Sequence, residues 1–203
     1  MNLTGTVEQL SVELYKKFPA AVEALYKSRA IHRQLEKYQA VALYGLAQRY
    51  NKDGAHFLEV GTLAGFSASI IAQAAPLAQL TTLNCKSWEV ATAKATLLQY
   101  KNVKVTEAVS WEYLATYKGF ELDFIFVDGN HNRVAQDIPW FNWLKPGGMM
   151  LFHDYSPLTS CVVYDTVNLA VTKLGRQIDV MIMDDNKVGM AGIIKRAGDV
   201  CPM

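Results

Sequence analysis

From residue 55 onward, short apolar runs alternate with stretches of helical periodicity, and this alternation restricts the fold more than any other feature of the chain. The apolar runs predict strands at His56–Val60, Leu80–Asn84, Val103–Glu107, Phe124–Val127 and Met149–Phe152. The stretches between them predict helices at Phe66–Ala75, Trp88–Tyr100, Trp111–Tyr117 and Val134–Leu144. Strands that alternate with helices form right-handed crossovers, so we expect a doubly wound α/β fold with a mostly parallel sheet.

The C-terminal part of the chain carries a different pattern. Apolar residues at helical spacing after Tyr155 predict one more helix, with Gly175 as its C-cap. Ile178–Met183 and Val188–Lys195 then flank a polar turn at residues 184–187. Two apolar runs around such a turn predict an antiparallel hairpin, which would complete a sheet of seven strands.

The N-terminal residues 1–50 predict helices that Phe18-Pro19 divides, because proline is tolerated in the first turn of a helix but not in its interior. No repeat, low-complexity segment or internal linker separates these helices from the rest. We therefore predict one domain over residues 1–203, with an N-terminal helical cap at 1–50 and an α/β core at 55–203.

Composition and charge argue against several classes of partner. Twenty basic and 19 acidic residues give a net charge of +1, which lacks the basic excess of a nucleic-acid binder. Apolar runs such as Ala68–Ala72 are far too short to span a bilayer, so we expect no membrane partner. Cys85, Cys161 and Cys201 are scattered and show no metal-finger spacing. We interpret them as reduced thiols of a cytoplasmic protein.

The first chemical motif is FLEVGTLAGFSASI at residues 57–70, a strand, a glycine turn and a helix start. Gly61 and Gly65 allow a ligand to approach the backbone closely, and Ser67 offers a hydroxyl near the helix N-terminus. The spacing ExGxxxG differs from the GxGxxG of dinucleotide-binding turns. Glu59 would repel a pyrophosphate and would face a cation better, such as a sulfonium ligand with a free amino group. The alternative is a packed turn without a ligand.

Two further motifs bring acids and histidines to the ends of neighbouring strands. DFIFVDGNH at residues 123–131 delivers Asp128 and His131, and KPGGMMLFHDY at 145–155 delivers His153 and Asp154. In open α/β sheets, ligands bind outside the carboxyl ends of the strands. The alternatives are that Asp128 caps the following segment and that the histidines only satisfy backbone groups.

Taken in order, LEVGTLAGFSA, DFIFVDGNH and LKPGGMMLFHDY resemble the class I S-adenosylmethionine-dependent methyltransferases. The resemblance is closest to family 24 and to the small-molecule O-methyltransferases related to catechol O-methyltransferase, and it covers roughly residues 35–175. It implies a Rossmann-like seven-stranded sheet. It also implies that S-adenosylmethionine binds at Glu59, Gly61, Gly65, Ser67 and Asp128, and that a methyl group is transferred to an oxygen nucleophile.

The same resemblance implies a divalent cation. Members of this wider group hold a metal with acids after the fourth and fifth strands, and the matching positions here are Asp128, His153 and Asp154. Hard oxygen ligands suit Mg²⁺, whereas a histidine is less typical of Mg²⁺ and suggests another divalent cation. The catalytic base of the group matches His131, so Asp128, His131 and His153 are the implied catalytic residues.

The chain departs from the family pattern at two positions. An acid that binds the ribose hydroxyls normally ends the second strand, and here the matching residue is Asn84. We expect Asn84→Asp to tighten cofactor binding if Asn84 meets the ribose, because charge-assisted hydrogen bonds are stronger than neutral ones. Val109 stands where an acid near the adenine is common, so Ser110 and Trp111 are the expected adenine contacts.

The leading hypothesis is an enzyme that methylates a hydroxyl of a small molecule. The alternative is a catalytically degenerate domain of the same fold that acts as a binding or assembly module, which Asn84 and Val109 would favour. A nicotinamide-dependent oxidoreductase is disfavoured by the ExGxxxG turn. Trp140 and Trp143 follow Pro139 on a predicted helix and would serve either the core or a contact in a homo-oligomer.

Overall fold

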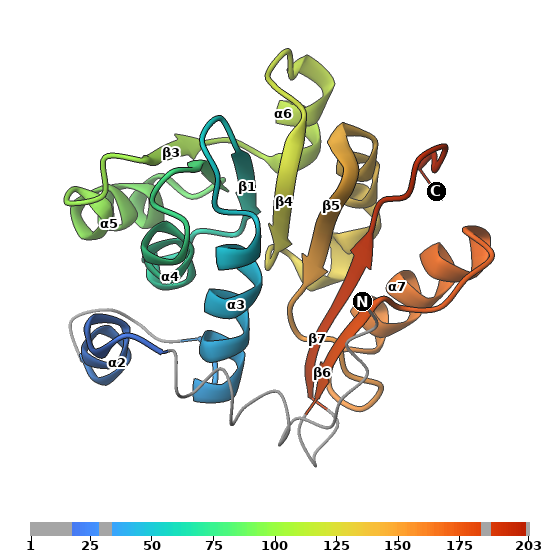
Figure 1. Ribbon diagram of the computed structural model, residues 1–203, viewed down its shortest axis with the longest axis horizontal. Coiled ribbons are helices and arrows are strands. Elements are labelled where there is room, and N and C mark those ends of the chain that lie inside the picture. Colours follow the sequence, from blue (N-terminus) through green and yellow to red (C-terminus); the bar gives the residue numbers. More distant parts are fainter. Residues whose placement is uncertain (1–17, 29–33, 184–187, 202–203) are drawn as a thin grey trace.

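A seven-stranded sheet forms the centre of the computed structural model, which describes residues 18–28, 34–183 and 188–201 (Figure 1). The strand order is β3-β2-β1-β4-β5-β7-β6. Strands β1 to β5 pair in parallel, while β7 runs antiparallel to both β5 and β6. This arrangement confirms the predicted doubly wound, mostly parallel sheet with a C-terminal antiparallel hairpin.

Except for the start of β5, the strands begin and end close to the predicted positions: β1 His56–Val60, β2 Gln79–Asn84, β3 Val103–Glu107, β4 Leu122–Val127, β5 Leu144–Phe152, β6 Val180–Met183 and β7 Gly189–Ile194. The helices are α2 Ala20–Lys27, α3 Lys37–Arg49, α4 Phe66–Ala74, α5 Ser87–Leu97, α6 Ser110–Thr116 and α7 Cys161–Lys173. Gly175 has a φ of +66° just after α7, as its predicted role at the C-cap requires. Helix α3 confirms part of the N-terminal helical prediction, whereas residues 1–17 and the turn at 184–187 lie outside the described residues.

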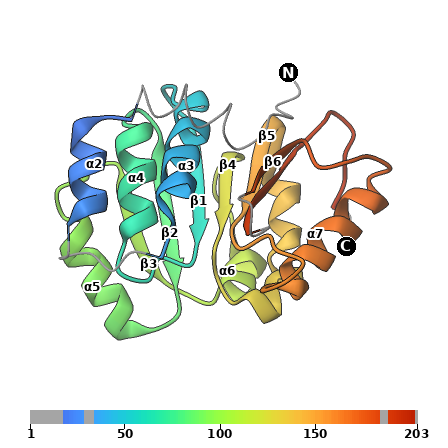
Figure 2. The same ribbon diagram turned by 90° about the horizontal axis from the view of Figure 1, so that it is seen from below.

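Helices cover both faces of the sheet because successive strand side chains point to opposite sides. Phe124 and Phe126 of β4 pack with α3 and α4 on one face. Ile125 and Val127 pack with α7 and with the 3₁₀ stretch η2 (Ile138–Trp143) on the other. Figure 2 shows α2, α3 and α4 on one side of the sheet and α6 and α7 on the other. Burial on both faces explains why the central strand β4 is a continuous apolar run after Asp123 rather than an alternating one.

One predicted helix is wrong. The segment predicted as a helix over Val134–Leu144 instead forms two 3₁₀ stretches, η1 His131–Gln136 and η2 Ile138–Trp143. Pro139 is the physical reason, since proline disfavours helical geometry in the residue before it and cannot donate a backbone hydrogen bond. Trp140 nevertheless reaches the core, where it is fully buried.

The turn predicted before the fifth strand is also wrong. Strand β5 begins at Leu144, five residues earlier than expected, and it includes Lys145, Pro146 and both glycines that follow. The pairing with β4 shifts register between Leu122 and Phe124, and Gly147 has a φ of +87°. The glycines therefore accommodate an irregularity within an extended strand.

The strand order reverses direction between β1 and β4, and this switch point positions the site. From β1 the chain winds outward through β2 and β3, then returns across β1 to β4 and winds the other way. The loops on the two sides diverge there, so a crevice opens at the carboxyl ends of the strands. Within the described ranges, no helix has the length and apolar character needed to cross a membrane.

Candidate functional site

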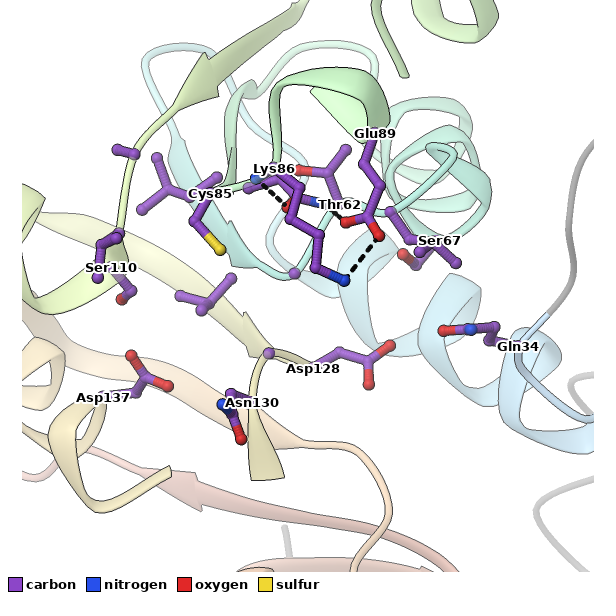
Figure 3. A pocket seen from close by; sticks show the side chains of 18 of the residues that line it. Gln34, Thr62, Ser67, Cys85, Lys86, Glu89, Ser110, Asp128, Asn130 and Asp137 are labelled. Atoms are coloured by element: carbon purple, nitrogen blue, oxygen red, sulfur yellow. Dashed lines mark hydrogen bonds and ion pairs between the residues drawn. The ribbon is translucent and has the colours of Figure 1, made fainter. Parts of the chain in front are cut away.

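A cavity of about 390 Å³ opens at this switch point, a size that suits a small ligand. The segments that follow β1, β2, β3 and β4 form its walls, and Gln34 and Leu35 close one end. Figure 3 shows Lys86 and Glu89 on one side of the cavity and Asp128 and Asn130 on the opposite side. Of the residues predicted to bind a cofactor, six line this cavity: Gly61, Ser67, Asn84, Ser110, Trp111 and Asp128.

The loop after β1 explains why glycine stands at position 61. Gly61 has a φ of +98°, and a side chain there would overlap the backbone carbonyl of Asp128 at the end of β4. Gly65 has a φ of +88° and N-caps α4 without lining the cavity itself. Leu63 also has a positive φ, of +44°, although it carries a side chain. Such strained residues cluster at ligand sites, so the loop has the geometry of a ligand cradle.

Glu59 lies beneath this loop and does not line the cavity. Its side chain is fully buried, and the hydroxyls of Thr82 and Ser67 face its carboxylate. Burial raises the pKa of Glu59 to about 7, and the two hydroxyls only partly offset that effect. Ser67 is the neighbour of Glu59 that reaches the cavity, whereas the predicted contact between Glu59 and a cationic ligand stays a prediction.

Asn84 ends β2 in the cavity wall, but its amide is already engaged. Its Nδ2 donates to Glu89 Oε2 over 2.9 Å, and its Oδ1 accepts from the Lys86 backbone N–H over 3.1 Å. Glu89 belongs to the first turn of α5, is 5 % exposed and lines the cavity. Sequence reasoning missed Glu89, although an acid five residues after the missing one was a signal that could have identified it.

Ser110 and Trp111 form the far end of the cavity, at the start of α6. The Ser110 Oγ accepts a hydrogen bond of 2.8 Å from Trp140 Nε1, so η2 holds this wall in place. Trp111 lies in the same wall, with the Arg133 guanidinium 5.5 Å from its ring centre. Asp137, which sequence reasoning also missed, lines the cavity here, and burial raises its pKa to about 6.

Next to the cavity, the ends of β4 and β5 bring four predicted site residues together. One ligand atom from each of Asp128, His131, His153 and Asp154 lies within 4.8 Å of the others. His153 Nδ1 is 2.8 Å from Asp128 Oδ1, and His131 Nε2 is 3.7 Å from the same oxygen. His131 Nε2 and His153 Nε2 each lie 3.5 Å from an oxygen of Asp154.

Charge pairing dominates the electrostatics of this cluster. Burial by itself would raise the pKa of Asp128, but the charge of His153 and hydrogen bonds from both histidines hold that pKa below its ordinary value. The hydrogen bond to Asp128 raises the pKa of His131. Burial opposes a charge on His153, yet the charge and hydrogen bond of Asp128 raise its pKa. Gln39 Oε1 of α3 faces His153 Nε2 over 3.2 Å.

The donor set of the cluster fits a divalent cation. Two carboxylates and two imidazoles converge, and a cation between them would relieve the repulsion between the acids. Asp154 holds a φ of +52°, a conformation that non-glycine residues rarely adopt and that places its carboxylate toward the histidines. The buried hydrogen bond that His153 Nδ1 donates to Asp128 orients the ring of His153, as carboxylates do for metal-bound histidines.

Comparisons with known proteins agree with the observed fold. Residues 58–155 match the model of a family described as a methyltransferase domain. One similar structure is a methyltransferase from Podospora anserina bound to S-adenosylhomocysteine (SAH), which is 17 % identical to this chain. The TM-score is 0.69, and the match covers 93 % of this chain and 94 % of that one. An O-methyltransferase from Bacillus cereus in complex with SAH is 17 % identical, with a TM-score of 0.65 and coverage of 95 % and 93 %.

A third solved structure has a similar sequence identity, TM-score and coverage. The O-methyltransferase TomG from Streptomyces achromogenes, in complex with SAM, is 16 % identical, with a TM-score of 0.64 and coverage of 90 % of this chain and 89 % of that one. No curated protein matches the sequence at a significant level. At such identities the solved structures establish the shared fold.

Proposed function

We propose that this chain, which belongs to the methyltransferase family matched at residues 58–155, transfers the methyl group of S-adenosylmethionine to a hydroxyl of a small molecule. The observation that carries the proposal is the position of the Asp128, His131, His153 and Asp154 cluster. It adjoins the switch-point cavity through Asp128, which belongs to both. A cofactor in the cavity would therefore lie beside groups able to accept a proton and to hold a cation. The SAH and SAM complexes of the similar structures support the choice of cofactor.

The proposed cofactor position follows the cavity from end to end. The methionine part would lie at Gly61 and Ser67, where a backbone turn and a hydroxyl meet its charged groups. The ribose would lie at the end of β2, and the adenine would lie between Ser110 and Trp111, whose indole offers a stacking surface. This arrangement directs the sulfonium toward Asp128 and the cluster.

In the proposed reaction, His131 accepts the proton of the acceptor hydroxyl. The oxygen forms a bond to the methyl carbon as the carbon–sulfur bond breaks, and the sulfur leaves as a neutral thioether. His131 suits this role because it is the more exposed histidine of the cluster, at 38 % against 4 % for His153. Asp128, His153 and Asp154 would hold the divalent cation, which when bound orients the acceptor and lowers the pKa of its hydroxyl.

The alternative function, a catalytically degenerate binding module, depends on the missing acids at Asn84 and Val109. The structure weakens that reading, because Glu89 returns a carboxylate to the end of β2 and Asp137 returns one to the adenine end. A degenerate domain would also have no need to hold Asp154 in a strained conformation.

The test is methyl transfer from S-adenosylmethionine labelled in its methyl group. The purified chain, supplied with Mg²⁺ or Mn²⁺, is incubated with a panel of hydroxylated small molecules such as phenols and sugars. We expect labelled methyl ethers in the small-molecule fraction and one equivalent of S-adenosylhomocysteine (SAH) for each. Cofactor binding without methyl transfer to any member of the panel would support the degenerate module instead.

A further inference from the structure

We infer that Glu89 of α5 is the carboxylate that binds the ribose hydroxyls of the cofactor, and that Asn84 positions it. The inference rests on the proposed function, since it assumes that the cavity takes an adenosyl group. It assigns to the helix a role that the family pattern gives to the last residue of the second strand.

The hydrogen bonds of Asn84 support the assignment. Its amide donates to Glu89 Oε2, and its oxygen accepts from the backbone of Lys86. These two bonds fix the amide plane and therefore fix one oxygen of the neighbouring carboxylate. Asn84 thus positions Glu89. As an amide, Asn84 has no carboxylate of its own to offer a ribose.

Glu89 itself has the burial and the orientation of a ligand-binding acid. It is 5 % exposed, although most glutamates lie in solvent, and it forms part of the cavity wall. Each of its oxygens has one protein partner, Nδ2 of Asn84 for Oε2 and Nζ of Lys86 for Oε1. A carboxylate accepts about four hydrogen bonds, so both oxygens keep capacity for two adjacent hydroxyls.

Lys86 contacts the Glu89 carboxylate from the solvent side. Its Nζ lies 3.0 Å from Glu89 Oε1, and its side chain is 61 % exposed. Figure 3 shows this pair across the cavity from Asp128. The lysine counters the charge of Glu89 at the cavity mouth and leaves the inner side of the carboxylate to the ligand.

The same geometry explains why an amide stands at position 84. An aspartate there would place a second carboxylate about 3 Å from that of Glu89, and like charges at this distance repel. One of the two positions must therefore be neutral. The expectation from sequence, that Asn84→Asp tightens cofactor binding, is accordingly reversed.

The experiment is a calorimetric titration of SAH into the wild type and three variants. We expect Glu89→Gln to weaken binding about 10-fold, because charge-assisted bonds to the ribose become neutral ones. Asn84→Asp should also weaken binding, through repulsion of Glu89. The double variant Asn84→Asp/Glu89→Gln restores one carboxylate and should bind within about threefold of wild type. Glu112→Gln, on the exposed side of α6, is the matched control and should bind like wild type.

A second readout compares two ligands, and its first comparison uses only the wild type. An SAH analogue that lacks the ribose 2′-hydroxyl should bind the wild type several-fold more weakly than SAH does, and Glu89→Gln should show a smaller difference between the two ligands. Equal affinity of wild type and Glu89→Gln for SAH, or of the wild type for the two ligands, would overturn this inference alone. A wild-type chain that binds no SAH would instead overturn the proposed function.

Discussion

Replacing His131 with alanine is expected to lower the rate of methyl transfer by about 10²–10⁴-fold, the range over which a positioned general base contributes to catalysis. Affinity for SAH should stay within about twofold of wild type, because His131 does not line the cofactor cavity. Single-turnover rates with a hydroxyl acceptor, together with titrations of SAH, measure the two quantities. His56→Ala is the control, since this histidine stacks on Phe120 at the opposite end of β1.

Measurements of Mn²⁺ affinity distinguish the proposed base, His131, from the proposed metal ligands of the cluster. Loss of an outer-shell partner typically costs 10–100-fold in metal affinity. Asp154 is a proposed direct ligand, so Asp154→Ala should weaken Mn²⁺ binding by more, at least about 100-fold. His131→Ala should leave Mn²⁺ affinity within a few-fold. His131 Nε2 lies 3.5 Å from Asp154, however, which is close enough for a fourth ligand. If both variants lose Mn²⁺ to the same degree, His131 is a ligand and another group takes the proton.

Glu59→Gln is expected to remove a pH dependence of stability worth about 3 kcal/mol. The pKa of Glu59 rises from an ordinary 4.5 to about 7 in the folded chain. The native state therefore binds the proton more tightly than the unfolded state, and the stability from this group is fully present below pH 4.5. It is lost progressively as the pH rises from there to about 7, at about 1.4 kcal/mol for each unit.

Urea unfolding at pH 5 and pH 8 measures this effect. The wild type should lose more stability between the two values than Glu59→Gln, by about 2–3 kcal/mol. Glu112→Gln controls for a general change of charge. Equal pH dependence in wild type and Glu59→Gln would show that Glu59 is ionised in the folded chain, with the hydroxyls of Thr82 and Ser67 compensating its burial.

The sequence predicted the sheet well because its central strands are buried on both faces. Runs such as Phe124–Val127 are apolar at every position, and the helical stretches between them leave only a parallel, doubly wound arrangement. The segment after β4 was misread as a helix because Val134, Ile138 and Phe141 recur at intervals of four and three residues, which fits one. The local effect of Pro139 outweighs that periodicity.

The cluster of acids and histidines was predictable for a topological reason. Parallel strands deliver the residues that follow them to one edge, so Asp128, His131, His153 and Asp154 had to approach one another. Glu89 was not predictable in the same way. Its position five residues after β2 was a signal, but the path of the chain into α5 was needed to show that its side chain turns back to Asn84. The full burial of Glu59 was not predictable either, since a strand-end position does not reveal which face its side chain takes.

A titration of SAH into the wild-type chain, with NAD⁺ as the competing ligand, tests most directly whether the cavity binds the proposed cofactor. We predict one molecule of SAH bound per chain, with a dissociation constant on the order of 10 µM, and no heat from NAD⁺ at the same concentration. Binding of NAD⁺ in preference to SAH, or of neither ligand by a folded chain, would contradict this prediction.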